Sequence, residues 1–512
     1  MSTHHSDTNS RERPRRLNWR RIRRGCGCCF GSCGGVVVIL FVLVFWWLQR
    51  VPQTYPGVEH PIPPPDSRHP LGGDQEGFAS PYIGHTGSWD GKGGAMGGKS
   101  KIGDMDQERA MGLRWTFMPV YWSVMEPTGP VELSRDTPAA WRELDQFVIA
   151  AHERKLNILM QAPVVGGNAG GPPDWAGRRE KGKAAPENMQ ALADFAGKLA
   201  ARYAPDGTLA RQLGWTDHYG VRAWEMDNEP ASYGVCWKGQ AADYAEFVTR
   251  AAARIRQADS HAVIVAPGLA AGGGLDSWLT QALSPTLLAG SPTFKRNGIH
   301  YSLGPSIDVV SFHIYEGLDT AFAGKDRTVE RAFTEMRAAF ESGEKQSPGF
   351  EYSRKQEYWH TEGNFDFLGV LSAHRRAAWR TQFMTRAFAA GIRKVVVMDA
   401  SPVEQAAVGA YVQALPDPFP MQPANDVGVI LRGKATLFRH TDRANPTGGQ
   451  VWVVWAQADT GDAEIEIPVT HAQVETISIE GYHAHPPLNG NRVRLHLTGD
   501  EKMPAPLLLI DR

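Results

Sequence analysis

Cysteine is scarce in this sequence, and most of it lies in one short stretch. Of the five cysteines in 512 residues, four fall between positions 26 and 33, and Cys236 stands alone in the remainder. A framework of disulfides therefore cannot hold the larger part of the chain together. The sequence also lacks a usable Asn-x-Ser/Thr site, because Asn445 is followed by proline. This second absence favours a protein of the bacterial envelope.

A strong net charge is absent as well. The formal net charge is -1, so the chain as a whole gives no sign of a nucleic-acid partner or of a strongly charged substrate. The balance conceals a basic amino-terminal segment, because residues 1–24 contain eight arginines. A hydrophobic content of 42% and a charged content of 21% are those of a globular protein, and the length is enough for two domains with an appendage.

Charge is missing entirely between Arg24 and Arg50, and residues 34–48 are almost wholly apolar. The uncharged length suffices to cross a bilayer core of about 30 Å at about 1.5 Å per helical residue. We predict that residues 25–50 form an uncleaved transmembrane anchor. The basic residues 1–24 would stay in the cytoplasm, which places the bulk of the protein in the periplasm or outside the cell. The alternative, a cleaved signal peptide, lacks a small-residue cleavage site after the apolar run.

The clustered cysteines lie at the cytoplasmic edge of this predicted anchor. They are candidates for acylation, and the alternative is that they are simply small residues at a helix end. A metal site is disfavoured because no histidine or carboxylate lies at ligand spacing. After the anchor, residues 51–77 are rich in proline and poor in apolar residues, which predicts an extended tether. The clustered cysteines are Cys26, Cys28, Cys29 and Cys33.

From residue 78 to about residue 410, short apolar runs alternate with helical stretches. This alternation is typical of βα units around a parallel sheet, and runs such as Val395-Val396-Val397 suit strands that are buried on both faces. No glycine fingerprint follows the first strand, so a dinucleotide-binding fold is disfavoured. The predicted fold class is therefore α/β, a (β/α)8 TIM barrel over residues 78–410. Its strands are expected at 80–85, 113–121, 156–164, 221–226, 262–266, 307–313, 357–361 and 394–399.

Helical periodicity fills the gaps between these strands. Thr137 followed by Pro138 predicts the capped start of one helix. Two more are predicted over about 241–255 and 372–390. The three- and four-residue spacing of an amphipathic helix is clearest through Met189, Leu192, Phe195, Leu199 and Tyr203.

Two of the predicted strands end in a carboxylate. One is followed by Asn228-Glu229-Pro230, where proline stops both strand and helix, and the other runs into Glu362-Gly363. In a (β/α)8 barrel the carboxyl ends of the strands carry the chemistry, because the loops there vary while the barrel below stays packed. Two carboxylates delivered by two strand ends are the minimum equipment for cleaving a glycosidic bond.

These stretches resemble a known group of enzymes. Trp224-Glu225-Met226-Asp227-Asn228-Glu229-Pro230 after the fourth strand and Trp359-His360-Thr361-Glu362-Gly363 after the seventh look like the retaining glycoside hydrolases of clan A. Phe312-His313-Ile314-Tyr315 after the sixth strand and Trp122-Ser123-Val124-Met125-Glu126-Pro127 after the second add to the resemblance. Among the families of the clan, the chain is most similar to family 39 and next to family 5. Gln161 stands where family 5 has a histidine, and no tryptophan closes the eighth strand.

The resemblance implies roles for eight residues. Glu229 would be the general acid/base, Glu362 the nucleophile, and Asn228 the donor to the sugar hydroxyl beside the anomeric carbon. Tyr315 would donate to Glu362 and keep it ionised. No metal and no other cofactor is implied. The residues expected to shape the subsite nearest the scissile bond are His313, Arg114, Trp122 and Trp359.

Each of these residues also has a simpler explanation. Asn-Glu-Pro alone is a common loop sequence, and most tryptophans of a globular protein lie in the core. His313 could be a satisfied core histidine, and Arg114 could be a buried ion-pair partner. Glu225 and Asp227 are close enough to Glu229 in sequence to be mistaken for the acid, so the choice among them rests on the resemblance.

Beyond about residue 425 the pattern changes to short strands separated by polar turns. Residues 425–512 are predicted to form a small β-sandwich, which is either a structural flank or a carbohydrate-binding module. His483 and His485 have the strand spacing of a metal pair, but no carboxylate stands beside them in sequence. The strands are expected at 451–454, 463–467, 473–479, 493–497 and 507–510.

The sequence thus predicts a retaining glycoside hydrolase that cleaves O-glycosidic bonds of an extracytoplasmic polysaccharide, with an exopolysaccharide as one candidate. One alternative is a glycan-binding or scaffolding barrel without catalysis, and another is a transglycosylase that uses the same two glutamates. The expected partners are the polysaccharide or glycoconjugate substrate and the membrane, which is contacted through one amino-terminal helix. No nucleic acid is expected.

Overall fold

In the computed structural model the chain divides into two units, Met1–Pro52 and Gln53–Arg512, and every residue described below belongs to the second. The predicted segments 1–24 and 25–50, and most of the predicted tether, lie outside the described residues. Within the part that the structure describes, no helix is long and apolar enough to cross a membrane. The described residues are 71–73, 75–85, 101–133, 137–165, 171–179, 185–231, 237, 240–270, 275–283, 303–316, 328–345, 357–364, 371–398, 400–441, 449–458, 460–500 and 502–512.

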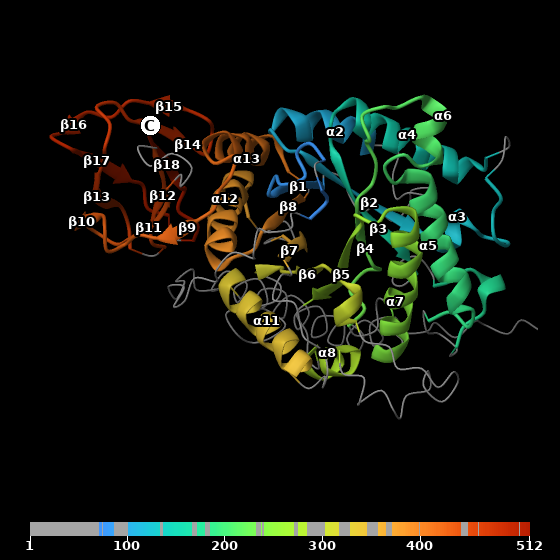
Figure 1. Cartoon of the computed structure of the whole chain (residues 1–512). Helices are drawn as coiled ribbons and strands as arrows, with labels where there is room; N and C mark the ends of the chain where they lie inside the picture. The colour runs from blue at the N-terminus through green and yellow to red at the C-terminus, as the bar shows by residue number, and fades with distance from the viewer. Residues whose placement is uncertain are drawn as a thin grey trace, which may run out of the picture. The chain divides into compact units, whose positions relative to one another are not determined.

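A closed barrel of parallel strands follows the order of the sequence, as predicted (Figure 1). Each strand pairs with its neighbours in the chain, and β1 closes the barrel against β8 with Ile83 opposite Val396. Strands β3 and β8 are buried along their whole length, as apolar strands covered on both faces should be. The strands are β1 (Tyr82–His85), β2 (Trp115–Tyr121), β3 (Asn157–Val164), β4 (Ala223–Glu225), β5 (Val263–Ala270), β6 (Val309–His313), β7 (Glu357–Glu362) and β8 (Lys394–Met398).

Helices cover the outside of the barrel (Figure 1). In α5 the apolar face predicted from the sequence is buried, and the side chain of Asn188 caps the helix by accepting from the amide of Ala191 at 3.0 Å. The predicted cap at Thr137 is wrong: Pro138 occupies the N-cap position of α4, and no side chain caps that helix. Within the described residues, the helices of four or more residues are α2 (Lys101–Ala110), α3 (Trp122–Met125), α4 (Ala139–Glu153), α5 (Met189–Tyr203), α6 (Thr208–Leu213), α7 (Ala241–Ala258), α8 (Leu275–Leu283), α11 (Val329–Lys345), α12 (Ala373–Ala390) and α13 (Pro402–Ala414).

Aromatic side chains fill the amino end of the barrel interior. The rings of Phe78 and Trp115 meet edge to face at 4.6 Å, and those of Trp115 and Trp359 at 5.7 Å. The ammonium of Lys394, the first residue of β8, lies 4.6 Å from the ring centre of Trp115 and donates to the carbonyl of Ser80 at 2.7 Å. These contacts join the chain before β1 to the start of β8, so this end of the barrel is a packed plug.

The carboxyl-terminal strands form two antiparallel sheets, which confirms the predicted sandwich. Trp452, Val454 and Leu509 of the larger sheet share one apolar core with Ile465, Val493 and Leu495 of the smaller. On the barrel side, Gln382 of α12 donates to the carbonyl of Pro504 at 2.7 Å. The larger sheet has the order β15-β14-β18-β12-β11-β9 and the smaller β10-β13-β17-β16. The strands are β9 (Met421–Pro423), β10 (Val429–Arg432), β11 (Ala435–Thr441), β12 (Gln450–Ala456), β13 (Ala463–Pro468), β14 (Glu475–Ser478), β15 (His483–Ala484), β16 (Leu488–Asn489), β17 (Arg492–Leu497) and β18 (Leu507–Asp511).

Candidate active site

The turn after β4 carries Glu229 to the carboxyl end of the barrel. Asp227 and Glu229 both have positive φ, 61° and 41°, a backbone conformation that is uncommon for residues with a side chain and that often marks functional sites. The buried carboxylate of Asp227 accepts from the amide of Val165 at 3.1 Å, which ties the turn to the end of β3. The strained turn is thereby fixed, and the side chain of Glu229 remains only 18% exposed.

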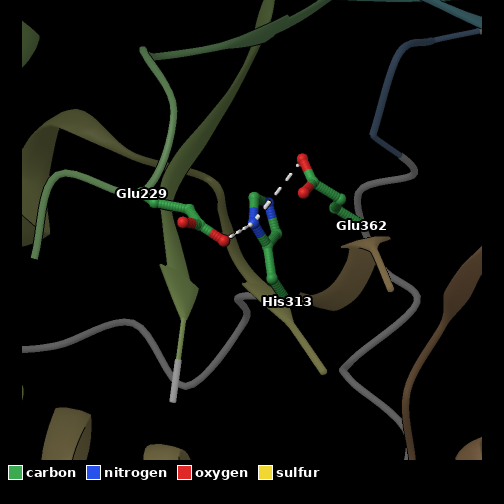
Figure 2. A group of neighbouring side chains, drawn as sticks. All are labelled: Glu229, His313 and Glu362. Atoms are coloured by element: carbon green, nitrogen blue, oxygen red, sulfur yellow. Dashed lines mark hydrogen bonds and ion pairs between the residues drawn. The ribbon is translucent and has the colours of Figure 1, made fainter. Parts of the chain in front are cut away.

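His313, the last residue of β6, lies between the two glutamates (Figure 2). Its Nδ1 is 2.9 Å from Oε1 of Glu229 and 3.8 Å from Oε2 of Glu362, and its side chain has no exposed surface. A carboxylate oxygen of Glu229 and one of Glu362 lie within 4.8 Å of each other. The structure therefore brings together two carboxyl groups from strands that are far apart in the sequence.

Glu362 ends β7 and has its own donor. The hydroxyl of Tyr315 donates to Oε1 of Glu362, and the carbonyl of Glu362 accepts from the amide of Ile314 at 3.1 Å. A Cβ on Gly363 would lie 2.1 Å from the carbonyl oxygen of Ile314. Only glycine fits there, which explains why glycine directly follows the carboxylate in the sequence.

The three ionisable groups shift one another's pKa. Burial lowers the pKa of His313, but the carboxylates of Glu362, Glu229 and Glu225 outweigh it and raise the pKa to about 9. Burial raises the pKa of Glu362 above its ordinary value, and so does the charge of Glu229, whereas His313 and Tyr315 act in the opposite direction. At neutral pH His313 therefore keeps a proton in its hydrogen bond with Glu229.

Polar residues lie beneath these groups, and none of them except Asn228 was predicted to belong to the site. Glu225 is fully buried and accepts from Oγ1 of Thr361 at 2.7 Å and from Nε2 of Gln161 at 3.3 Å. The same nitrogen of Gln161 donates to Oδ1 of Asn228 at 3.1 Å. Burial raises the pKa of Glu225, whereas His313 and its hydrogen-bond donors Thr361 and Ser311 act in the opposite direction. The signal in the sequence was a run of polar residues at the carboxyl ends of otherwise apolar strands.

Three of the eight predicted site residues are buried or lie at the amino end of the barrel. Trp359 is fully buried in the plug at the amino end of the barrel, and its indole N–H donates to Glu357 at 2.8 Å. Trp122 is also fully buried, donates to Glu126 at 3.0 Å and stacks on Phe195 of α5.

Arg114 precedes β2, so it lies at the amino end of that strand, where its carbonyl accepts from the amide of Asn157 at 2.8 Å. The structure thus brings together Glu229, Glu362, Asn228, His313 and Tyr315. It places Trp359 and Arg114 at the amino end of the barrel, and it buries Trp122, just after β2, against Phe195.

Among the described residues, Glu229, His313 and Glu362 form the one cluster of three or more side chains with metal-ligating atoms close enough to share an ion. The tail histidines have other partners: Nδ1 of His483 lies 2.7 Å from Glu475, and Nδ1 of His485 lies 3.1 Å from the carbonyl of Val474. The absence of a metal from the reaction stays a prediction.

No family model matches the chain, and no curated protein matches it by sequence. Solved structures do match. A family 39 glycoside hydrolase from Bacteroides cellulosilyticus WH2 has a TM-score of 0.56 at 12% identity, with 85% of this chain and 81% of that chain covered. CelM2, a bifunctional glucanase-xylanase from a metagenome library, has a TM-score of 0.53 at 13% identity, with 89% of this chain and 97% of that chain covered. AbfB, a family 51 alpha-L-arabinofuranosidase from Bifidobacterium longum, has a TM-score of 0.52 at 11% identity, with 85% of this chain and 96% of that chain covered.

The neighbours are described as a family 39 glycoside hydrolase, a glucanase-xylanase and a family 51 arabinofuranosidase, so the resemblance predicted from the sequence is confirmed at the level of the fold. The fold that this chain shares with them is a closed eight-stranded parallel barrel. Identities of 11% to 13% do not carry a substrate or a mechanism from one protein to another.

Proposed function

We propose that this protein is a retaining O-glycoside hydrolase that works through Glu229 and Glu362. The observation that carries the proposal is the separation of the two carboxylates, whose nearest oxygens lie within 4.8 Å. Retaining enzymes hold their two carboxyl groups about 5–5.5 Å apart, whereas inverting enzymes need about 6.5–9.5 Å to admit a water molecule. The spacing supports a double displacement through a covalent glycosyl-enzyme intermediate.

The hydrogen bonds support one division of roles. A hydroxyl that donates to a carboxylate favours its ionised form, so the bond from Tyr315 suits Glu362 as the nucleophile. Glu229 shares a proton with Nδ1 of His313, which suits the general acid/base. Asn228, the neighbour of Glu229 in the turn, would donate to the hydroxyl beside the anomeric carbon.

The charge of Glu362 links the two steps of this reaction. While Glu362 is ionised, its charge raises the pKa of His313 and so helps to keep a proton on the pair formed by His313 and Glu229. When Glu362 forms the glycosyl ester, that charge is lost, and the pair gives up its proton more readily to the departing oxygen. In the second step Glu229 takes a proton from water, and hydrolysis of the ester restores the charge of Glu362. The pair of His313 and Glu229 would thus act as the acid in the first step and as the base in the second, and the proton taken from water restores its starting state.

The proposed substrate is a polysaccharide outside the cytoplasm. CelM2 is described as a glucanase-xylanase, which is consistent with a polymeric substrate for a chain of this fold. The apolar segment at 34–48, preceded by the basic residues 1–24, supports an uncleaved anchor that leaves the barrel periplasmic or extracellular. Deletion of residues 1–50 should move the protein from the membrane fraction to the soluble fraction, and an unchanged distribution would contradict the anchor.

The test is an activity screen of the full chain on bacterial exopolysaccharides and plant polysaccharides, with release of reducing ends as the signal. Glu229→Gln and Glu362→Gln should each abolish release, and proton NMR of the first product should show the anomeric configuration of the substrate. An inverted product, or full activity in both variants, would refute the mechanism. Binding without release would instead favour a glycan-binding barrel, and transfer to sugar in place of water would indicate a transglycosylase.

A further inference from the structure

A network of hydrogen bonds connects the backbone of β5 to Asn228, and in it each group can act only as a donor or only as an acceptor toward a given neighbour. The amide of Gly268 donates to Oγ of Ser311 at 2.9 Å. Ser311 is fully buried, and its hydroxyl hydrogen-bonds to Glu225. A backbone N–H can only donate, so Ser311 must accept from it and use its own hydrogen toward the carboxylate.

Glu225 is the acceptor on which these bonds converge. Thr361 and Gln161 both donate to its carboxylate, at 2.7 and 3.3 Å, and Ser311 adds a further donor. Donors aimed at a buried carboxyl group favour the ionised, acceptor-only form. Gln161 must therefore present its NH2 group to Glu225, because its carbonyl oxygen would face another acceptor.

Gln161 also donates a hydrogen bond to Asn228. Its Nε2, already turned toward Glu225, also contacts Oδ1 of Asn228 at 3.1 Å. An amide nitrogen donates and does not accept, so Asn228 has to present its oxygen to Gln161 and turn its own NH2 group the other way. Asn228 is partly exposed and adjoins Glu229, so the orientation of this amide decides whether a donor or an acceptor faces a sugar there.

We propose that Gln161 and Glu225 are positioning residues that fix the amide of Asn228 with its donor toward the substrate, so that the protein selects glycosides with a free hydroxyl beside the anomeric carbon over their 2-deoxy analogues. This inference rests on the proposed function. It adds a specificity determinant that touches no substrate itself and that acts through the direction of hydrogen bonds rather than through shape.

The sharpest test replaces the hydrogen-bond donor at position 161 by an acceptor. Gln161→Glu keeps the shape of the side chain, but it sets a second carboxyl group against the buried carboxylate of Glu225, so the two share one proton. That hydrogen lies between positions 161 and 225, which leaves only an acceptor facing Asn228, so the amide of Asn228 should turn its NH2 group toward position 161. Gln161→Met removes both hydrogen bonds without imposing the opposite direction. Gln212→Glu, on the exposed face of α6, makes the same change of charge away from the site and serves as the control.

The kinetic measurement compares para-nitrophenyl β-D-glucoside and β-D-galactoside, each with its 2-deoxy analogue. Gln161→Glu should lower kcat/KM on the hydroxylated glycoside roughly 10- to 100-fold, the scale of one misdirected buried hydrogen bond, and lower it less than about 3-fold on the deoxy analogue. The kcat/KM of Gln161→Met on the hydroxylated glycoside should lie between those of Gln161→Glu and the wild type. Equal losses on both substrates, or a larger loss for Gln161→Met, would indicate packing alone and overturn the proposal.

Neutron diffraction from deuterated crystals reads the amide directly and does not depend on turnover. The wild type should show the deuterons of Asn228 directed away from Gln161, and Gln161→Glu should show them directed toward position 161. Opposite or unchanged orientations would overturn the proposal even in an active enzyme. If no glycoside or polysaccharide is cleaved while the amide turns as expected, the proposed function fails and the positioning of Asn228 stands.

Discussion

The two ends of the barrel interior differ in what fills them. At the amino end, Phe78, Trp115 and Trp359 pack against one another, and the ammonium of Lys394 lies among their rings. At the carboxyl end the interior is polar, with Glu225 buried beneath the cluster of His313 and the two glutamates. The same strands build both ends, so a few residues along one strand separate packing from chemistry.

Strand β7 shows this division most clearly. Trp359 and Glu362 are three positions apart, and one is fully buried in the plug while the other is 19% exposed beside His313. An apolar plug lowers the free energy of the fold, whereas a buried carboxylate raises it unless it is paired. We therefore expect substitutions at the amino end to change stability, and substitutions at the carboxyl end to change activity.

The largest stability effect is expected at Trp359. Trp359→Ala removes a fully buried ring and should lower the free energy of unfolding by about 3–5 kcal/mol, measured by urea denaturation. The folded fraction should keep its kcat. Trp215→Ala, at a partly exposed ring after α6, is the matched control and should cost less. A loss below about 1 kcal/mol for Trp359→Ala would show that the plug does not stabilise the barrel.

An intermediate effect, on activity, is expected at His313. The proposed reaction uses the proton shared by His313 and Glu229, and the pKa of about 9 for His313 means that wild-type activity should fall as the pH rises through that value. His313→Asn should lower kcat/KM about 10- to 100-fold and move the basic limb of the pH profile to lower pH. A basic limb that does not move would separate His313 from the proton transfer.

The smallest effect is expected at Arg114, which the sequence placed in the substrate site. Because it precedes β2 and lies at the amino end, Arg114→Ala should leave kcat/KM within about 2-fold of the wild type. A higher KM for Arg114→Ala with unchanged kcat and unchanged stability would mean that Arg114 contributes to substrate binding, which would contradict the division of stability and activity between the two ends.

Periodicity predicted most of the fold. The alternation of apolar runs and amphipathic helices located all eight barrel strands, because parallel strands buried on both faces leave a strong apolar signal. The short strands β9, β10, β15 and β16 were missed; most of their residues are exposed, so they lack the alternation of buried and exposed positions that marks the longer strands of the sandwich. The positive φ of Asp227 and Glu229 had no signal either, because neither residue is a glycine.

The site was predicted in part. Asn228, Glu229 and Glu362 followed from motifs that resemble a known clan, but Trp359 and Trp122 were assigned to the subsite although a pattern does not tell a ring in the cleft from a ring in the core. Arg114 could have been excluded, because a residue at the start of a strand lies opposite the chemistry. The role proposed for Gln161 could not be predicted from the sequence, since it depends on contacts with Glu225 and Asn228, which are more than sixty positions away.

The most direct test of the central claim is to trap the intermediate. The wild type is incubated with a panel of activated 2-deoxy-2-fluoro glycosides, which form the glycosyl ester readily and hydrolyse it slowly, and the labelled peptide is sequenced by mass spectrometry. We expect one sugar per chain, attached to Glu362, and no label in Glu362→Gln. A label on Glu229 or Glu225, or release of product without a covalent intermediate, would contradict it.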